Sequence, residues 1–240
     1  LKKMNKIWKI RFDQLPNNPE ILLESLRIRS LITDVTEMKT EWLRLVTVST
    51  NFKYFELSEE TLDYLCEKGL KNDPEIHICR SNLLWSKGSE FKSKAIKYLK
   101  KNVDENNPQF HLILGKWHQE EGDYQQAREQ VSKITLVNSD DYKLWSEINY
   151  NLHETNNQLS YLVDSFEASL NGISLCSQHQ LIFTLRILST LFRRGCTEIY
   201  SKFTEMYKKI PLHVWIFVLP QIIARANSKD KELILTFSAK

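Results

Sequence analysis

The amino-acid sequence predicts an all-α protein built as an α-solenoid, a row of stacked helical hairpins. Glycine and proline number only six each in 240 residues, and such depletion favours long helices over turn-rich β structure. Strong signals for helix starts recur along the chain, and a segment near its middle repeats at intervals of about 32 residues. The apolar and charged shares, 42% and 26%, are those of a globular protein and exclude a disordered tail or a small disulfide scaffold.

Three helix starts combine a capping side chain with proline at the first helical position. They are Asn18-Pro19-Glu20, Asp73-Pro74-Glu75 and Asn107-Pro108-Gln109. The capping oxygen accepts a hydrogen bond from an otherwise unpaired backbone N–H, and proline has no N–H that needs a partner there. Two more starts are predicted at Ser58-Glu59-Glu60 and Ser139-Asp140-Asp141, because the helix dipole favours acids in the first turn.

Between these starts, apolar residues recur at helical spacing. One stripe contains Leu22, Leu26, Ile28 and Leu31, and another contains Leu62, Leu65, Cys66 and Leu70. Farther along, the pattern predicts helices over 142–153, 158–171, 178–194, 197–209 and 212–226, joined by turns around Gly172, Gly195 and Pro211. The sequence therefore predicts about a dozen helices.

Two copies of one hairpin motif lie near the middle of the chain. The matching positions, 32 residues apart except for the glycines at 34, are Trp85 and Trp117, Ala95 and Ala127, Leu99 and Val131, and Gly88 and Gly122. Alanine on the second helix lets the two helices approach closely, as in tetratricopeptide-like or HEAT-like hairpins. We expect the clearest hairpins over 73–136, with irregular helical hairpins as the alternative.

Nothing in the sequence marks a domain boundary. No Ser/Gly-rich linker, acidic block or low-complexity tract occurs, so we expect one helical-repeat region over 1–240. The chain opens on Leu1 and runs directly into a helical pattern, which suggests a segment of a longer protein.

The longest apolar stretch, 212–224, is shorter than the roughly 20 residues needed to span a bilayer, so no membrane span is expected. Four cysteines without framework spacing indicate reduced thiols in an intracellular protein.

Residue types that bind metals occur in two places, and both are interpreted as ordinary helix residues. Cys66, His77 and Cys79 match no common zinc spacing and have no fourth ligand. Cys176 and His179 span an expected turn with no third ligand nearby. We expect no metal and no cofactor in this chain, and core packing for His77 and Cys79.

A basic stretch, Lys92 to Lys101, contains five lysines, of which Lys94, Lys97 and Lys101 share one helix face. Basic residues with interleaved aromatics can bind phosphate backbones, but Phe91 and Tyr98 are needed for hairpin packing. The net charge of only +3 likewise gives no reason to expect direct binding of nucleic acid. A solvated outer face is the preferred interpretation, with nucleic acid or an acidic protein partner as alternatives.

No enzyme signature occurs in the sequence. It contains no Gly-rich phosphate loop, no Gly-x-Ser-x-Gly, no kinase catalytic-loop or metal-binding triplet and no His-Glu-x-x-His. We therefore expect this chain to have no catalytic residues of its own.

The last third of the chain is the most distinctive part. Its helix over 212–226 is strongly apolar and contains Pro220, which predicts a kink at that residue. The carbonyl freed by proline needs a partner, and Gln221 or Arg225 is the candidate to supply it.

At these residues the chain resembles a known family. Trp215 followed by Leu219-Pro220-Gln221 and Arg225, preceded by Leu185-Arg186-Ile187-Leu188 and Leu191-Phe192, is similar to the FAT region of the phosphatidylinositol-3-kinase-related protein kinases. Arg29-Ser30-Leu31-Ile32 with Trp42 resembles the early part of that region. The target-of-rapamycin branch is the most similar, although Ser189-Thr190 departs from its usual order. Trp85-Ser86-Lys87-Gly88 is more similar to the ATM/ATR-like kinases.

The resemblance implies an α-solenoid that clamps a kinase domain of the same polypeptide and docks regulatory subunits of a large complex. Residues 177–240 would be the C-terminal FAT helices, with Trp215, Pro220, Gln221 and Arg225 as structural and hinge residues. The parent kinase would use ATP and Mg, and we expect this chain to bind neither of them. It would be cytoplasmic if it is of the target-of-rapamycin type, and nuclear if it is ATM/ATR-like or a kinase-dead TRRAP/Tra-like scaffold. A free-standing tetratricopeptide-like adaptor that binds peptides is the remaining alternative.

Overall fold

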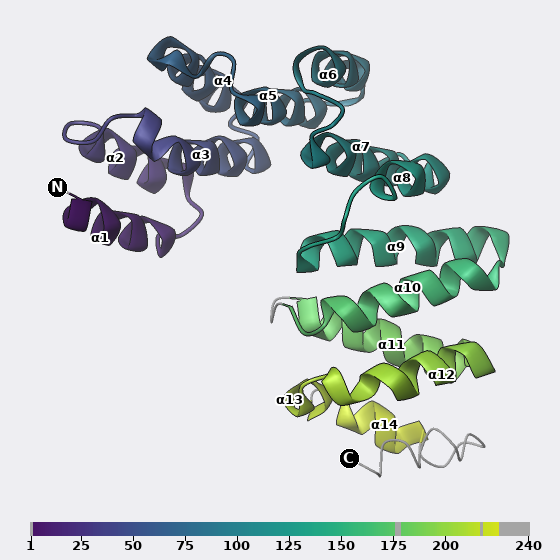
Figure 1. Ribbon diagram of the computed structural model, residues 1–240. Helices are drawn as coiled ribbons and strands as arrows, with labels where there is room; N and C mark the ends of the chain where they lie inside the picture. The colour runs from purple at the N-terminus through teal and green to yellow at the C-terminus, as the bar shows by residue number, and fades with distance from the viewer. Residues whose placement is uncertain (1, 176–178, 217, 226–240) are drawn as a thin grey trace. The chain divides into compact units, whose positions relative to one another are not determined.

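The computed structural model describes residues 2–175, 179–216 and 218–225, with the side chains at 2–5, 209, 224 and 225 outside that description. All regular elements in these ranges are helical, as Figure 1 shows. The predicted all-α fold class of helical hairpins is confirmed. The chain forms two compact units, Leu1–Phe110 and His111–Lys240, each with its own packed helices.

The first unit is built from six helices and two short helical turns. These are α1 (Lys2–Asp13), α2 (Pro19–Arg29), η1 (Thr36–Met38), α3 (Lys39–Asn51), α4 (Phe55–Leu65), η2 (Cys66–Leu70), α5 (Pro74–Ser86) and α6 (Ser89–Asn102). Helix α3 packs against α4, and α5 packs against α6, as two hairpins that also contact each other (Figure 1). The turn η2 is π-helical and contains Gly69 at φ 96°, a left-handed conformation that glycine adopts without strain.

The second unit is also built from packed helices. Helix α7 (Pro108–Glu120) runs into it from the first unit, and it contains α8 (Tyr124–Val131), α9 (Ser139–Asn156), α10 (Leu159–Gly172), α11 (Gln180–Arg194), α12 (Thr197–Met206), η4 (Tyr207–Lys209), α13 (Leu212–Ile216) and α14 (Leu219–Arg225). The most extensive contact joins α9 and α10 along their lengths (Figure 1). A continuous apolar core then connects α10, α11, α12 and α13.

The three starts that pair a capping residue with proline are confirmed. The Asn18 Oδ1 atom accepts from the backbone N–H groups of Glu20 at 2.9 Å and Ile21 at 3.2 Å. Asp73 and Asn107 each accept one such bond at the starts of α5 and α7. Local capping chemistry therefore fixes where these helices begin.

Of the other two predicted starts, the one at Ser58 is wrong and the one at Ser139 is confirmed. Ser58 lies inside α4, fully buried, and its hydroxyl donates to the carbonyl of Tyr54 one turn earlier. A serine that bonds to the preceding turn is compatible with a helix interior. Helix α9 does begin at Ser139, but its cap is Asn138, which forms a reciprocal capping box with Asp141.

The first predicted apolar stripe is only half buried, so the prediction is wrong for Ile28 and Leu31. Leu22 and Leu26 are buried, but Ile28 is 57% exposed and Leu31 is 82% exposed. The next buried position of α2 is occupied by Arg29, because residues spaced by four and then three lie on one face of a helix. In the second stripe Leu62 and Leu65 are fully buried, as predicted.

The repeated hairpin motif occupies equivalent packed positions. Ala95 and Ala127 have no exposed surface, and Trp85 and Trp117 are buried. The repeated glycines both turn the chain with positive φ, 132° at Gly88 and 79° at Gly122. Helix α5 packs against α6, and α7 packs against α8 through Leu112, Ala127 and Val131. The likeness of 73–136 to tetratricopeptide hairpins stays a prediction.

The predicted kink at Pro220 is wrong. The segment forms two helices, α13 and α14, and Pro220 is the second residue of α14. The N–H groups of Gln221 and Ile222 both donate to the carbonyl of Val218, so the missing N–H of proline leaves no gap in the ladder. Proline in the first turn begins a helix rather than bending one.

In the part of the chain that the structure describes, no helix combines the length and the apolar character needed to cross a membrane.

Enlarging the alanine at the helix crossing should destabilise the second unit. We expect Ala127→Leu to lower the free energy of unfolding by about 1–3 kcal/mol, because the added methyl groups have no space at a fully buried position. Gln126→Leu, at an exposed position of the same helix, is the control and should change it by less than about 0.5 kcal/mol. Urea unfolding measures both variants, and equal midpoints would show that the crossing is not tightly packed.

Candidate functional site

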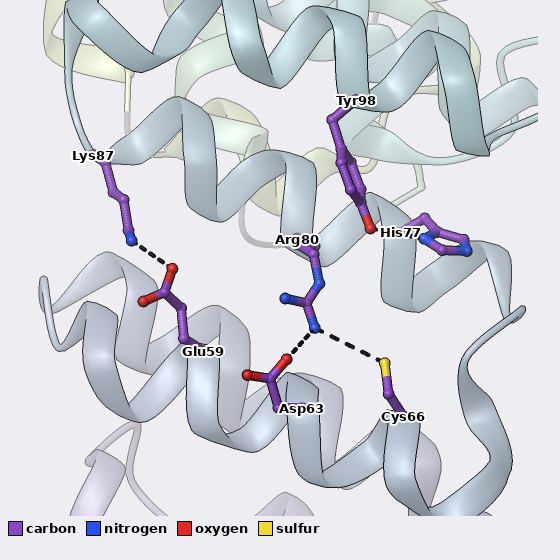
Figure 2. A network of polar contacts seen from close by, with 7 residues as sticks. All are labelled: Glu59, Asp63, Cys66, His77, Arg80, Lys87 and Tyr98. Atoms are coloured by element: carbon purple, nitrogen blue, oxygen red, sulfur yellow. Dashed lines mark hydrogen bonds and ion pairs between the residues drawn. The ribbon is translucent and has the colours of Figure 1, made fainter.

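Polar side chains connect three consecutive helices of the first unit. The guanidinium of Arg80 in α5 donates to the carboxylate of Asp63 in α4 at 2.7 Å and lies 3.9 Å from the Sγ atom of Cys66 (Figure 2). One turn earlier, the Nδ1 atom of His77 lies 3.0 Å from the hydroxyl of Tyr98 in α6. Helix α5 is thereby linked on one side to α4 and on the other to α6.

A second ion pair connects α4 to the end of the α5–α6 hairpin. Lys87, which caps α5, bonds the Glu59 carboxylate at 2.5 Å (Figure 2). Both ion pairs are partly exposed, so each contributes less than a buried pair would. Their effect is to fix the lateral position of α5 against α4.

The electrostatic environment of this network follows from its partial burial. Burial, together with the charge of Arg80, lowers the pKa of His77, which keeps the imidazole neutral at neutral pH. Burial also raises the pKa of Tyr98, so its hydroxyl remains protonated. Although burial opposes it, the bond to Asp63 holds the pKa of Arg80 above its ordinary value. The Arg80 guanidinium is thus a permanent cation, and His77 and Tyr98 form a neutral hydrogen-bonded pair beside it.

The cysteine in α5 is not a reactive thiol. Burial raises the pKa of Cys79 to about 12, with a further contribution from Glu75, so the thiolate that would attack or bind a metal is not formed near neutral pH. In the described part of the chain, no group of three or more His, Cys, Asp and Glu side chains is placed to hold a metal. Cys176 lies outside the described residues, and His179 bonds to Asp140 at 2.6 Å.

A buried ion pair holds the first helices of the chain together. Both terminal nitrogens of Arg29 in α2 lie 3.4 Å from one oxygen of Glu41 in α3, and the two side chains are 3% and 6% exposed. The guanidinium groups of Arg29 and Arg44 both lie over the ring of Phe12 in α1, at 5.8 and 5.3 Å from its centroid. Trp42, the other residue quoted for the early resemblance, packs against Tyr64 with ring centroids 5.3 Å apart.

A corresponding connection in the second unit is centred on Arg128 of α8. Its guanidinium donates to Asn149 in α9 at 2.8 Å and to Asp164 in α10 at 2.7 Å. The same group lies over the rings of Trp145 and Tyr161, at 5.2 and 5.1 Å. One side chain therefore links three helices through both charge and cation–π contact.

Arg186, from the segment that carries the family resemblance, enters a buried hydroxyl cluster. It donates to the Ser146 hydroxyl at 3.0 Å and lies 5.3 Å from the ring of Tyr150. Ser146 in turn bonds with Ser165 and Ser169 of α10. Burial lowers the pKa of Arg186, but a guanidinium starts so high that it stays charged.

Two hollows open on the surface of the first unit. The larger, about 760 Å³, lies between the start of α2, the α3–α4 turn and α4, and the smaller, about 320 Å³, lies between α2, α3 and α4. Tyr54, Phe55 and Phe91 give the larger hollow an aromatic lining, and its charges are of both signs. Neither lining contains a serine, cysteine or histidine paired with a base in the manner of a nucleophilic site.

The residues predicted from the sequence fall into two groups. Trp85, Ala95, Trp117 and Ala127 are buried where their hairpins pack. Trp215 is buried too, edge-on to Phe203 at 6.1 Å. Pro220 and Gln221 are exposed, and the side chain of Arg225 lies outside the described residues, so a hinge at these positions stays a prediction.

The sequence interpretation missed the arginines that connect the helices. Arg80, Arg128 and Arg186 each lie one helical turn from an apolar residue of the same helix, and that placement is the signal that was available. Their carboxylate and hydroxyl partners are 17 to 40 residues away, at Asp63, Asp164 and Ser146. No local pattern marks a partner at such a distance.

The Arg80–Asp63 pair should show a measurable coupling. In a double-mutant cycle with Arg80→Met and Asp63→Asn, we expect a coupling free energy of about 0.5–1 kcal/mol, because the pair is partly exposed but well aligned. The exposed Lys133–Glu129 pair within one helix turn serves as the control and should couple by about 0.3 kcal/mol. A coupling for Arg80–Asp63 no larger than the control would contradict its role in positioning α5.

The neutral state of His77 predicts a dependence of stability on pH. Its pKa is lower in the folded chain than the ordinary value of 6.5, so below pH 6.5 the unfolded chain binds more protons. The contribution of His77 is therefore fully present above pH 6.5 and is lost as the pH falls. His77→Gln should lose less stability between pH 7 and pH 5 than the parent chain does; thermal unfolding at each pH tests this, and parallel losses in the two proteins would contradict it.

Comparison with known proteins places this arrangement in a family. Residues 1–143, which include the network of Figure 2, match the FAT domain family. The chain is also similar to the serine/threonine-protein kinase tor1 of Schizosaccharomyces pombe (strain 972 / ATCC 24843), with 20% identity over 291 aligned residues. That alignment covers 97% of this chain and 12% of the kinase, so the chain spans a small part of the relative it matches.

The family match and the motif resemblance involve different parts of the chain. The match covers 1–143, whereas the most specific motifs lie at 185–225 and are reached by the alignment with tor1. The family match and the alignment with tor1 both agree with the resemblance to the FAT region. Since the matched residues are more than half of the 240, the chain belongs to the FAT domain family.

Proposed function

We propose that this chain is a non-catalytic regulatory segment of a very large serine/threonine protein kinase of the target-of-rapamycin type. The observation that carries the proposal is membership in the FAT domain family together with similarity to tor1 along nearly the whole chain. The kinase domain would be elsewhere in the same polypeptide, and its ATP and Mg would be bound there.

The mechanism that the structure supports is mechanical. Helices packed as successive hairpins contact mainly their neighbours, so a displacement at one hairpin passes to the next. The arginine contacts make this transmission stiffer, because Arg80 fixes α5 against α4 of the preceding hairpin and Arg128 fixes α8 against both α9 and α10. Such a segment would clamp the kinase domain and offer its outer helices to regulatory subunits.

The first test is the identity of the native polypeptide. We expect it to be many times larger than the 28.4 kDa of this chain, with peptides downstream that include the Asp-Phe-Gly triplet of a kinase. Size measurement and peptide mapping of the isolated protein decide this. The same size without the triplet would point to a kinase-dead TRRAP/Tra-like scaffold, and a polypeptide ending near Lys240 would leave a free-standing adaptor. A nuclear rather than cytoplasmic location would favour the ATM/ATR-like or TRRAP/Tra-like branches.

The regulatory part is tested in the same full-length protein. Arg128→Ala removes the contacts among α8, α9 and α10, so we expect kcat toward protein substrate to change about threefold or more while KM for ATP stays constant. Lys133→Ala, on the exposed surface just after α8, is the matched control and should leave both constants unchanged. Identical kinetics of the Arg128 variant and the parent would argue against mechanical coupling through this helix.

A further inference from the structure

Four lysines lie on the exposed side of helix α6, which also carries Glu90 and Ser93. Lys94, Lys97 and Lys101 lie at spacings of three and four residues, and Lys100 lies beside them, all exposed. The opposite face carries the fully buried Ala95 and Leu99. The acids nearest in sequence, Glu90, Asp104 and Glu105, flank this lysine face at its two ends and do not lie between its members.

The four exposed lysines of α6 differ from three other cations of the first unit in having no ion pair with a carboxylate of the described residues. Lys39, Arg80 and Lys87 each form an ion pair with a carboxylate of another helix or turn. Among the described residues, no carboxylate pairs with Lys94, Lys97, Lys100 or Lys101, and only Lys94 has a ring partner, Phe91 at 5.1 Å.

The helix dipole explains part of this arrangement. Lys100 and Lys101 lie in the last turn of α6, where cations are favoured. Lys94 and Lys97 lie before that turn, so the dipole does not account for them. Four like charges within eight residues repel one another, which an opposite charge from outside the chain would relieve.

The chemistry of this face favours a polypeptide over a nucleic acid or a membrane. Base stacking needs exposed aromatic rings, but Phe91 lies beneath Lys94 and the hydroxyl of Tyr98 is held by His77. A membrane-surface helix needs large apolar side chains beside its lysines, whereas Ala95 and Leu99 of α6 are buried in a helix that packs against α5.

We propose that the lysine face of α6 is a docking surface for an acidic peptide segment of a partner protein. Lys94, Lys97 and Lys101 span about 10 Å along the helix axis at 1.5 Å per residue, which matches carboxylates at positions i, i+3 or i+4, and i+7 of an acidic helix. The interaction is electrostatic and therefore fast to form and sensitive to salt. It does not depend on the kinase assignment, since it rests on this helix alone.

The experiment measures binding of a fluorescent helical peptide with glutamates at that spacing to the purified chain. Lys94→Glu, Lys97→Glu and Lys101→Glu together should weaken binding roughly tenfold or more, and arginine at the same three positions should retain it. The control combines Lys53→Glu, Lys71→Glu and Lys116→Glu, three exposed lysines outside α6, which change the net charge by the same amount. Circular dichroism of every variant establishes that it is folded.

Saturable binding that is lost in the α6 variant, kept in the control and weakened on raising salt to about 0.15 M supports the proposal. Equal loss in the α6 variant and the control overturns it, because binding would then follow bulk charge. No binding of the peptide at low salt also overturns it. Tighter, α6-dependent binding of single-stranded RNA, or of vesicles with acidic headgroups, assigns the face to that ligand instead.

Discussion

Close approach of two helices at a small side chain is the constraint on which both repeated hairpins depend. Ala95 and Ala127 have no exposed surface. At Gly115 in α7 an added Cβ would come within 2.5 Å of a methyl group of Val131 in α8. The large residues Trp85 and Trp117 on the first helix of each hairpin are buried as well. The glycine turns then need only to reverse the chain, which their positive φ values allow.

Apolar packing of this kind sets the distance between helices but leaves their lateral position weakly defined. The polar contacts supply that information, since a hydrogen bond has a direction that a methyl contact lacks. Arginine suits this role because its planar guanidinium can donate to one carboxylate and stack on a ring at the same time. Arg128 does both with three helices, and Arg80 does the former between α4 and α5.

The sequence was sufficient for features that depend on nearby residues. The three capped proline starts and the repeated hairpin could be predicted because cap, proline, glycine and alanine act within a few residues. The end of the stripe at Ile28 and Leu31 was not predictable, since the buried position went to Arg29, whose partner Glu41 lies on another helix. Polar contacts between helices were missed for the same reason.

The last helices differ from the prediction for another reason. The kink at Pro220 is predicted for one helix over 212–226, whereas the structure has two helices there. Proline in an apolar run predicts a kink only if the run is one helix. Hydrogen bonding to the Val218 carbonyl starts a new helix there, and Pro220 falls in its first turn. The site that follows from the structure is a set of contacts between helices, which no single segment of the sequence contains.

The buried pair of Arg29 and Glu41 has a consequence for how this sequence can change by descent. Losing one partner strands a charge in the core, at a cost of about 3–5 kcal/mol, whereas replacing both with apolar residues is close to neutral. Within the part of the chain that the structure describes, the Arg29 Nε atom already has no hydrogen-bond partner, which leaves little tolerance for a further loss. We therefore expect substitutions at these two positions to be tolerated together rather than singly, although twelve residues separate them.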